Sequence, residues 1–224
     1  SSAASDVYKR QVGKASVKPD LIVISMRLET EDKEYTTTTL AAAQRIDALN
    51  KSLEEIGFGK DALKTTDFSV RTVYESVREQ GGNYKSVFKG YACSHTLKVE
   101  FGFDAKRLAS ILSAISRCVA KPELTVTFTV KDPSAVSSEL LHAAAQNANE
   151  KANVLCSAAG VKLGELLSID YNFGDINVCS DTDYKVEGRC MMKAEACLSD
   201  INIVPDDIKV NDTVTFVWEI ERKY

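Results

Sequence analysis

The feature that most constrains the fold is a repeated change of hydrophobic period along the chain. The stretch PDLIVISMRLET, residues 19–30, alternates its apolar residues with period two and is rich in branched aliphatic side chains, a pattern typical of a β-strand. From about Tyr35 the apolar residues follow a helical period until Gly57, a residue type that commonly ends helices. Because strand and helix patterns follow each other in one chain, the sequence predicts a mixed fold of packed sheets and helices.

The same change of period recurs to the end of the chain. Residues 64–77 and 90–103 read as strands joined by the Gly-Gly turn of EQGGNY, which is a hairpin signal. Helices are predicted after Asp104 and over residues 134–159, behind Asp132-Pro133. The remaining extended segments are residues 122–130, 166–173, 188–198 and 212–221.

These elements predict an α+β fold with the order β-α-β-β-α-β followed by α-β-β-β. The first half has the order of a split βαβ, ferredoxin-like unit. We expect a largely antiparallel sheet with helices packed on one face. The helix at 134–159 is expected to pack through a face of mostly small residues, which is Leu141, Ala145, Ala148, Ala152, Leu155 and Ala159. The last strand, 212–221, is lightly charged and is predicted to be a sheet edge, with Val217 on its outer face. Trp218 is expected either at an interface or in the core.

The N-terminal segment, residues 1–11, lacks apolar periodicity. Its sequence SSAASDVYKRQ resembles translated sequencing-adapter read-through, so we expect it to be non-native and set it aside. Residues 12–224 are expected to form one domain of two intimately packed lobes, about 12–131 and 132–224. A signal peptide upstream of residue 12 would not be visible in this sequence.

The net charge argues against binding to nucleic acid, and the hydropathy argues against a membrane span. The net charge is −4 and the sequence contains no basic block, whereas binding to nucleic acid needs clustered Lys and Arg. No apolar run approaches the roughly 20 residues that span a bilayer. We therefore expect no nucleic acid partner and no membrane span.

The cysteines indicate the compartment. None of them forms a CxxC pair, so a structural zinc site has little support, and several fall on apolar strand or helix faces, where a free thiol behaves as a small hydrophobe. Reduced thiols predict a cytoplasmic protein; the alternative is export to the cell envelope, with the signal peptide missing from the sequence. The six are Cys93, Cys118, Cys156, Cys179, Cys190 and Cys197.

Cys93 and His95 lie two residues apart in GYACSHTLKVEFGF and share one apolar strand face. Their Cα atoms are then roughly 7 Å apart, and no third group that could orient a base is identifiable. Packing explains them better than catalysis or metal binding, and Gly90 is predicted to seat a β-bulge or to relieve strain. His142 has no HExxH partner.

An acidic set at Asp181, Asp183, Glu187, Asp206 and Asp207 could hold a cation, but it lacks the spacing of a calcium loop. Solvated loop charge explains it better. We therefore assign no catalytic residue, no cofactor-binding residue and no metal ligand.

Five segments together resemble the SIMPL-domain family, a largely bacterial and poorly characterised group. They are VKPDLIVISM, LKTTDFSV, GYACSHTLKVEF, AAAQNANEKANVLCSAAGVKLGELLSI and IVPDDIKVNDTVTFVWEI. The resemblance covers residues 12–224 and implies an α+β domain, no established catalytic residues, no cofactor and a tendency to self-associate. Many relatives are exported to the bacterial envelope, but the six cysteines depart from them.

Two hypotheses for the function follow. The leading one is a non-enzymatic protein that forms a homo-oligomer or binds an unknown protein partner, with a link to envelope or stress physiology. The alternative is an enzyme that uses Cys93, Cys179 or Cys190 as its nucleophile. Fast labelling of a thiol in the native protein near neutral pH would favour the alternative.

Overall fold

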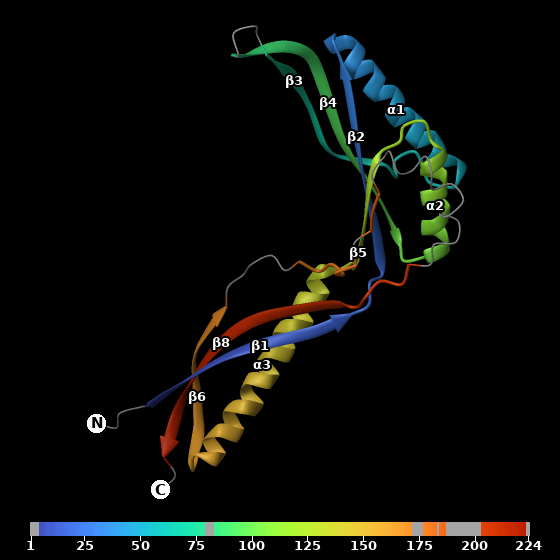
Figure 1. Ribbon diagram of the computed structural model, residues 1–224. Helices are drawn as coiled ribbons and strands as arrows, with labels where there is room; N and C mark the ends of the chain where they lie inside the picture. The colour runs from blue at the N-terminus through green and yellow to red at the C-terminus, as the bar shows by residue number, and fades with distance from the viewer. Residues whose placement is uncertain (1–4, 79–82, 172–176, 183, 187–202, 223–224) are drawn as a thin grey trace. The chain divides into compact units, whose positions relative to one another are not determined.

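The computed structural model describes residues 5–78, 83–171, 177–182, 184–186 and 203–222 (Figure 1). The chain divides into two compact units, and neither is one continuous stretch. The two-helix unit comprises Asp20–Phe128 and Thr182–Pro205. The α3 unit comprises Ser1–Pro19, Thr129–Asp181 and Asp206–Tyr224. The α+β class, with antiparallel sheets and helices packed on them, is confirmed.

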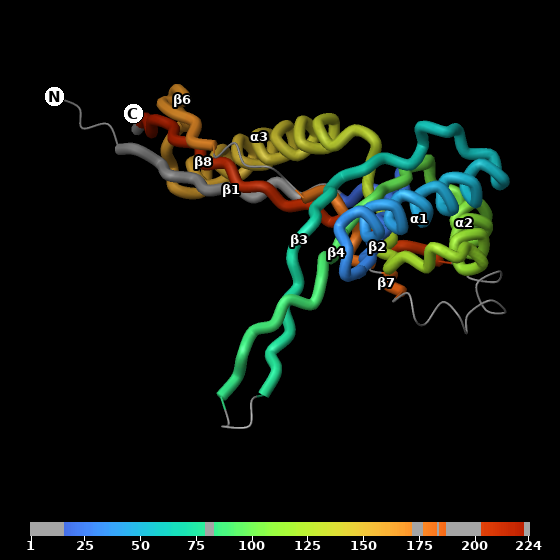
Figure 2. Tube along the Cα trace, turned by 90° about the horizontal axis from the view of Figure 1, so that it is seen from above, coloured from blue at the N-terminus to red at the C-terminus, as the bar shows by residue number. Residues whose placement is uncertain are grey.

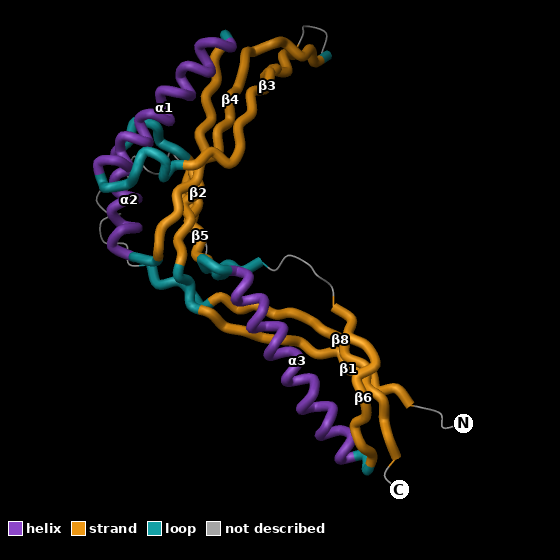
Figure 3. The backbone as a smooth tube through the Cα atoms, turned by 180° about the vertical axis from the view of Figure 1, so that it is seen from behind, coloured by secondary structure: helices purple, strands orange, loops and turns teal. Residues whose placement is uncertain are grey.

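The two-helix unit holds a five-stranded sheet in the order β3-β4-β2-β5-β7. Strand β4 pairs antiparallel with both β2 and β3, and helices α1 and α2 cover one face of the sheet (Figure 3). The elements are β2 (Leu21–Asp32), α1 (Tyr35–Glu55), β3 (Lys64–Arg78), β4 (Tyr84–Gly102), α2 (Ala105–Arg117), β5 (Glu123–Thr129) and β7 (Tyr184–Val186).

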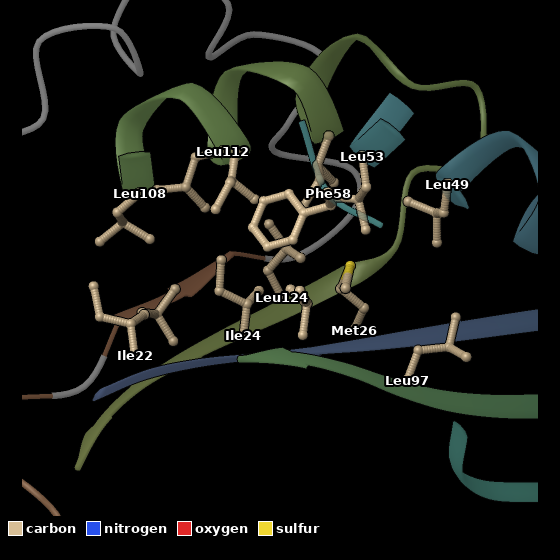
Figure 4. Close-up of a cluster of buried hydrophobic side chains, with 14 of the residues drawn as sticks. Ile22, Ile24, Met26, Leu49, Leu53, Phe58, Leu97, Leu108, Leu112 and Leu124 are labelled. Carbon is tan, nitrogen blue, oxygen red and sulfur yellow. The ribbon is translucent and has the colours of Figure 1, made fainter. Parts of the chain in front are cut away.

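The core of this unit lies between the sheet and the two helices (Figure 4). The period-two pattern of β2 buries Ile22, Ile24 and Met26 completely. They pack with Leu49 of α1 and with Leu112 of α2 in one hydrophobic cluster. Burying a side chain of this size stabilises a fold by about 1.5–3 kcal/mol, so this cluster holds the helices on the sheet.

The α3 unit holds a three-stranded antiparallel sheet in the order β1-β8-β6, with α3 packed against it. Asp132 caps α3, because its side chain accepts a hydrogen bond from the Ala135 N–H, and Pro133 occupies the first turn. Both features confirm the predicted helix start. The elements are β1 (Ser5–Val17), α3 (Pro133–Ala158), β6 (Val161–Tyr171) and β8 (Ile208–Arg222).

Small residues on α3 contact the sheet. Ala144, Ala148 and Ala152 are completely buried and pack with Phe216 and Trp218 of β8. The prediction for Ala148 and Ala152 is confirmed. It is wrong for Leu155, which is half exposed. The buried residues recur every four positions from Val136 to Cys156, so the contact stripe winds around the helix and leaves Leu155 outside it.

The predicted edge position of the last strand is wrong. Strand β8 is the middle strand, because β1 pairs with one of its edges and β6 with the other. Trp218 stacks on Phe216 at a ring distance of 5.4 Å and is 7% exposed, so it fills the core of the α3 unit. Val217 is also buried. The strand that covers the edge, β1, begins at Ser5 in the segment set aside above, and the predicted strand at 188–198 lies outside the described residues.

Replacing Ala148 with Leu should destabilise the protein by roughly 1–3 kcal/mol, because a fully buried position facing a sheet has no room for three more carbon atoms. Ala158→Leu, at the exposed end of the same helix, is the matched control and should change stability by less than about 0.5 kcal/mol. Urea unfolding followed by circular dichroism measures both. Equal stability of the two variants would contradict the close packing of α3.

Candidate interaction surface

Strand β4 is longer than its partner β2, and this difference creates a two-stranded ribbon. Strand β2 pairs with β4 only over residues 91–102 of β4. Beyond Tyr91, residues 84–90 pair with β3 alone. Figure 2 shows this end of the β3–β4 hairpin extending away from α1 and β2. We call residues 73–78 and 84–90 the ribbon.

Gly90 is the residue of β4 at which pairing with β2 has ended and the two-stranded ribbon begins. Val73 pairs with Gly90 while Tyr74 pairs with Phe88, so Lys89 is an extra residue and β4 bulges there. The predicted bulge is confirmed. Gly90 has φ of +151°, and a Cβ atom at this position would collide with the backbone carbonyl of Asp32. Only glycine fits, because it can adopt this backbone conformation and leaves room for the neighbouring strand.

Four aromatic side chains form a continuous row from the start of α1 onto the ribbon. The ring centroids are 5.6 Å apart for Tyr35 and Tyr91, 5.4 Å for Tyr91 and Phe88, and 5.8 Å for Phe88 and Tyr74. All three pairs meet edge to face, the arrangement that aromatic quadrupoles favour. Tyr35, Phe88 and Tyr74 are nevertheless 54%, 46% and 58% exposed. We call these four residues the aromatic row.

Other exposed apolar side chains lie on the same hairpin. They are Phe68, Val77, Tyr84 and Val87. Single exposed apolar residues need no explanation, but their concentration on one hairpin does. Aromatic residues are enriched where proteins bind each other. The hairpin is therefore the candidate interaction surface of this protein.

A small pocket of about 200 Å³ lies beside the aromatic row. Lys89 forms an ion pair with Glu31 at 3.2 Å, with both side chains about half exposed, so solvent screens the pair and its contribution to stability is small. The pocket is smaller than the usual 300–1,000 Å³ of small-molecule sites. It suits a side chain of a partner better than a free ligand. Its lining residues are Glu31, Asp32, Lys33, Val73, Lys89, Gly90 and Tyr91.

Cys93 lies on β4, a central strand of the sheet in the two-helix unit. It is 1% exposed and pairs with Thr30 of β2 and Val70 of β3. Burial raises the pKa of its thiol, which keeps the sulfur protonated and unreactive near neutral pH. This environment is typical of a packing residue rather than of a nucleophile.

His95 is two residues further along β4, between Leu28 of β2 and Phe68 of β3. Its ring lies 4.8 Å from that of Phe68, and its Nε2 is 3.3 Å from the hydroxyl of Thr65. Its Nδ1 is buried and has no hydrogen-bond partner. Burial lowers the pKa of His95, and the carboxylate of Asp67 partly offsets this effect. The imidazole is therefore neutral near pH 7 and acts as a packing group.

The other candidate residues are dispersed. Cys118 and Cys156 are buried and free, and Cys179 is partly buried and free. His142 is exposed on α3. Of the acidic set, Asp183 and Glu187 lie outside the described residues, as do Cys190 and Cys197. In the part of the chain that the structure describes, no three His, Cys, Asp or Glu side chains gather closely enough to hold a metal ion.

Sequence reasoning missed the aromatic row. Its members Tyr74 on one strand, and Phe88 and Tyr91 on the other, flank the Gly-Gly turn in the sequence. The visible signal was this grouping of aromatic residues around a predicted hairpin turn, whereas the extension of β4 back to Tyr84 came only from the structure. Tyr35 could not be added from the sequence, because only folding brings the start of α1 to the hairpin.

Comparison with known protein families shows which family the chain belongs to. The sequence profile of the SIMPL family, described as a protein of unknown function (DUF541), matches residues 12–218. The chain belongs to this family, as the resemblance predicted. A comparison with curated proteins found no match. Among the described residues, no helix is long and apolar enough to cross a membrane.

Gly90→Ala should destabilise the protein by about 1–3 kcal/mol, because alanine must adopt a strained backbone and its Cβ would meet the Asp32 carbonyl. Gly59→Ala is the control, since a Cβ at that position would have no atom within 4 Å. Urea unfolding of both variants checks the prediction. A Gly90→Ala protein as stable as the control variant would show that the bulge can relax freely.

Lowering the pH should cost stability through His95. Its pKa is lowered in the folded protein, so the unfolded chain binds the proton more readily and stability falls as the pH drops from about 6.5 toward the lowered value. Below that value the loss is complete and constant. The difference in unfolding free energy between the parent and His95→Gln, followed from pH 7.5 to pH 4.5 in ~0.5-unit steps, measures this effect. A difference that stays constant across the range would contradict it.

Proposed function

We propose that this protein is non-enzymatic and works by binding protein, and that it forms a homo-oligomer. The observation that carries the proposal is the exposed aromatic row on the β3–β4 ribbon, together with Phe68 and the exposed valines beside it. Three rings of the row are about half exposed although each contacts a neighbouring ring. They contribute little to the core of the two-helix unit and remain available to a partner.

The energetics of the ribbon support a binding role. Large aromatic side chains dominate the energy of many protein interfaces. Rings that already contact one another lose little side-chain freedom when a partner covers them, which lowers the entropic cost of association. An isolated two-stranded ribbon is only marginally stable in water. A partner on the ribbon would therefore stabilise it.

The chemistry of the cysteines supports a role without catalysis. Burial raises the pKa of Cys93, and its closest histidine in sequence, His95, packs on Phe68 with its pKa lowered by burial. Neither change favours a thiolate–imidazolium pair. The burial of Cys93, Cys118 and Cys156 as free thiols is consistent with a reducing compartment, and we propose a cytoplasmic location.

Site-specific photocrosslinking tests the proposal. A photoreactive phenylalanine at Tyr74 should form protein adducts in cells that produce the chain, either with a second copy or with another protein. The control is the same group at Val119, which is 82% exposed but lies outside the hairpin. Mass spectrometry of the adducts identifies the partner. Equal yields at Tyr74 and Val119 would contradict a binding role for the ribbon.

A further inference from the structure

We propose that two copies of this chain pair through the outer edges of their β3 strands, antiparallel and centred on Val73. The inference rests on the proposed function and names the partner and the register at the same surface. It follows from the position of β3 in the sheet, from the regularity of the strand, and from the order of its charges.

Strand β3 is an edge strand. It is the first strand in the order β3-β4-β2-β5-β7, so only β4 pairs with it among the described residues. Its outer N–H and C=O groups can accept another strand, which is how strand addition between proteins works. The extra residues of the hairpin are Thr66 at the start of β3 and Lys89 on β4. Residues 67–78 of β3 therefore run without interruption.

The other edge strands are β1, β7 and β6, and each is less suited to such pairing. Strand β1 carries the adjacent cations Lys9 and Arg10, and charged side chains on an edge oppose pairing with a second copy. Strand β7 has only three residues. Strand β6 carries register shifts between Leu163 and Leu166 and between Leu166 and Ser168. Bulges of this kind disturb the row of hydrogen-bonding groups and protect an edge against a second strand. Over residues 67–78 the strand β3 itself carries no extra residue, because the register shift between Val73 and Tyr74 comes from Lys89 on β4.

The charges of β3 are self-complementary. Asp67, Arg71 and Glu75 are spaced by four residues and so lie on one face of the strand. Antiparallel pairing about Val73 puts Arg71 of each copy opposite Glu75 of the other. In the single chain Arg71 reaches across β4 to Glu29 of β2 at 2.5 Å. In the pair it turns to the outer edge, where Glu75 of the other copy replaces Glu29. The exposed ion pair with Glu29 contributes little to stability, so its loss costs little. The contact between Arg71 and Glu75 occurs twice across the two-fold axis.

Competing registers are less favourable. Centred on Arg71, the strands place Arg71 opposite itself and Asp67 opposite Glu75. Centred on Glu75, they place Glu75 opposite itself. Like charges directly opposite each other destabilise a strand pair. Centring on Ser69 joins Asp67 to Arg71 but brings the extra residue Thr66 into the new ladder, whereas centring on Val73 uses residues 68–78 of the regular run.

The other face of β3 fits the same register. Thr72 lies opposite Tyr74, and Phe68 lies opposite Arg78, whose guanidinium can cover the ring. Phe68 and Tyr74 are 53% and 58% exposed in the single chain. Both become partly covered in the pair. The register therefore satisfies the charges on one face and covers aromatic surface on the other.

Charge reversal tests the register. The parent protein should show a mass above the 24.5 kDa of one chain in sedimentation velocity at micromolar concentrations. Arg71→Glu and Glu75→Arg should each weaken association by about tenfold or more, because two attractive contacts become repulsive. Mixing these two single variants should restore a pair, since one carries two acidic and the other two basic residues at these positions. The double variant should also associate.

Controls separate the register from other effects. Lys85→Glu makes the same charge change as Arg71→Glu but lies on β4, at the edge of the ribbon opposite to the outer edge of β3, and it should leave association unchanged. Circular dichroism of each variant verifies folding. If the parent associates and neither charge reversal weakens it, the β3 pairing is wrong but the proposed self-assembly stands. The same conclusion follows if the mixture of the two single variants fails to associate. A parent of single-chain mass at all concentrations would overturn both, while adducts with another protein at Tyr74 would preserve the binding role.

Discussion

The pairing of β2 with β4 is the interaction on which the two-helix unit depends. It places Ile24 beside Val99 and Met26 beside Leu97, and these residues supply the surface on which α1 and α2 pack. The pairing ends at Tyr91 because β2 ends at Asp32. The rest of β4 has only β3 beside it, so one strand builds both the core and the exposed ribbon. A longer β2 would continue the sheet beside the ribbon.

Gly90 marks the point along β4 where the core of the two-helix unit ends and the ribbon begins. Gly90 is buried against the backbone around Asp32, and its positive φ accompanies the extra residue Lys89. Beyond it, the ring of Phe88 contacts Tyr74 on one side and Tyr91 on the other. Aromatic contacts of this kind add about 0.5–1.5 kcal/mol beyond area burial. The ring contacts order the ribbon, while leaving its surface available for binding.

Local signals predicted most of the elements, because they act over a few residues. The period-two pattern located β2 and β3, and the caps Asp104 and Asp132 located the starts of α2 and α3. The Ala-rich contact face of α3 was predicted at Ala148 and failed at Leu155. The buried positions recur every four residues, slightly more than the 3.6 residues of one helical turn, so the contact stripe drifts around the helix and leaves Leu155 outside it. Family membership followed from many weak matches spread over the chain.

The sequence by itself determined the alternation of strands and helices, the shared face of Asp67, Arg71 and Glu75, and the need for glycine near residue 90. The tertiary structure decided which strands lie at an edge. Strand β8 reads as an edge from its own residues but is central, because β1, some 200 residues away in sequence, pairs with it. Strand β3 is an edge because β4 pairs with β2 on its other side. Strand order depends on contacts between distant segments, and local periodicity carries no information about those contacts.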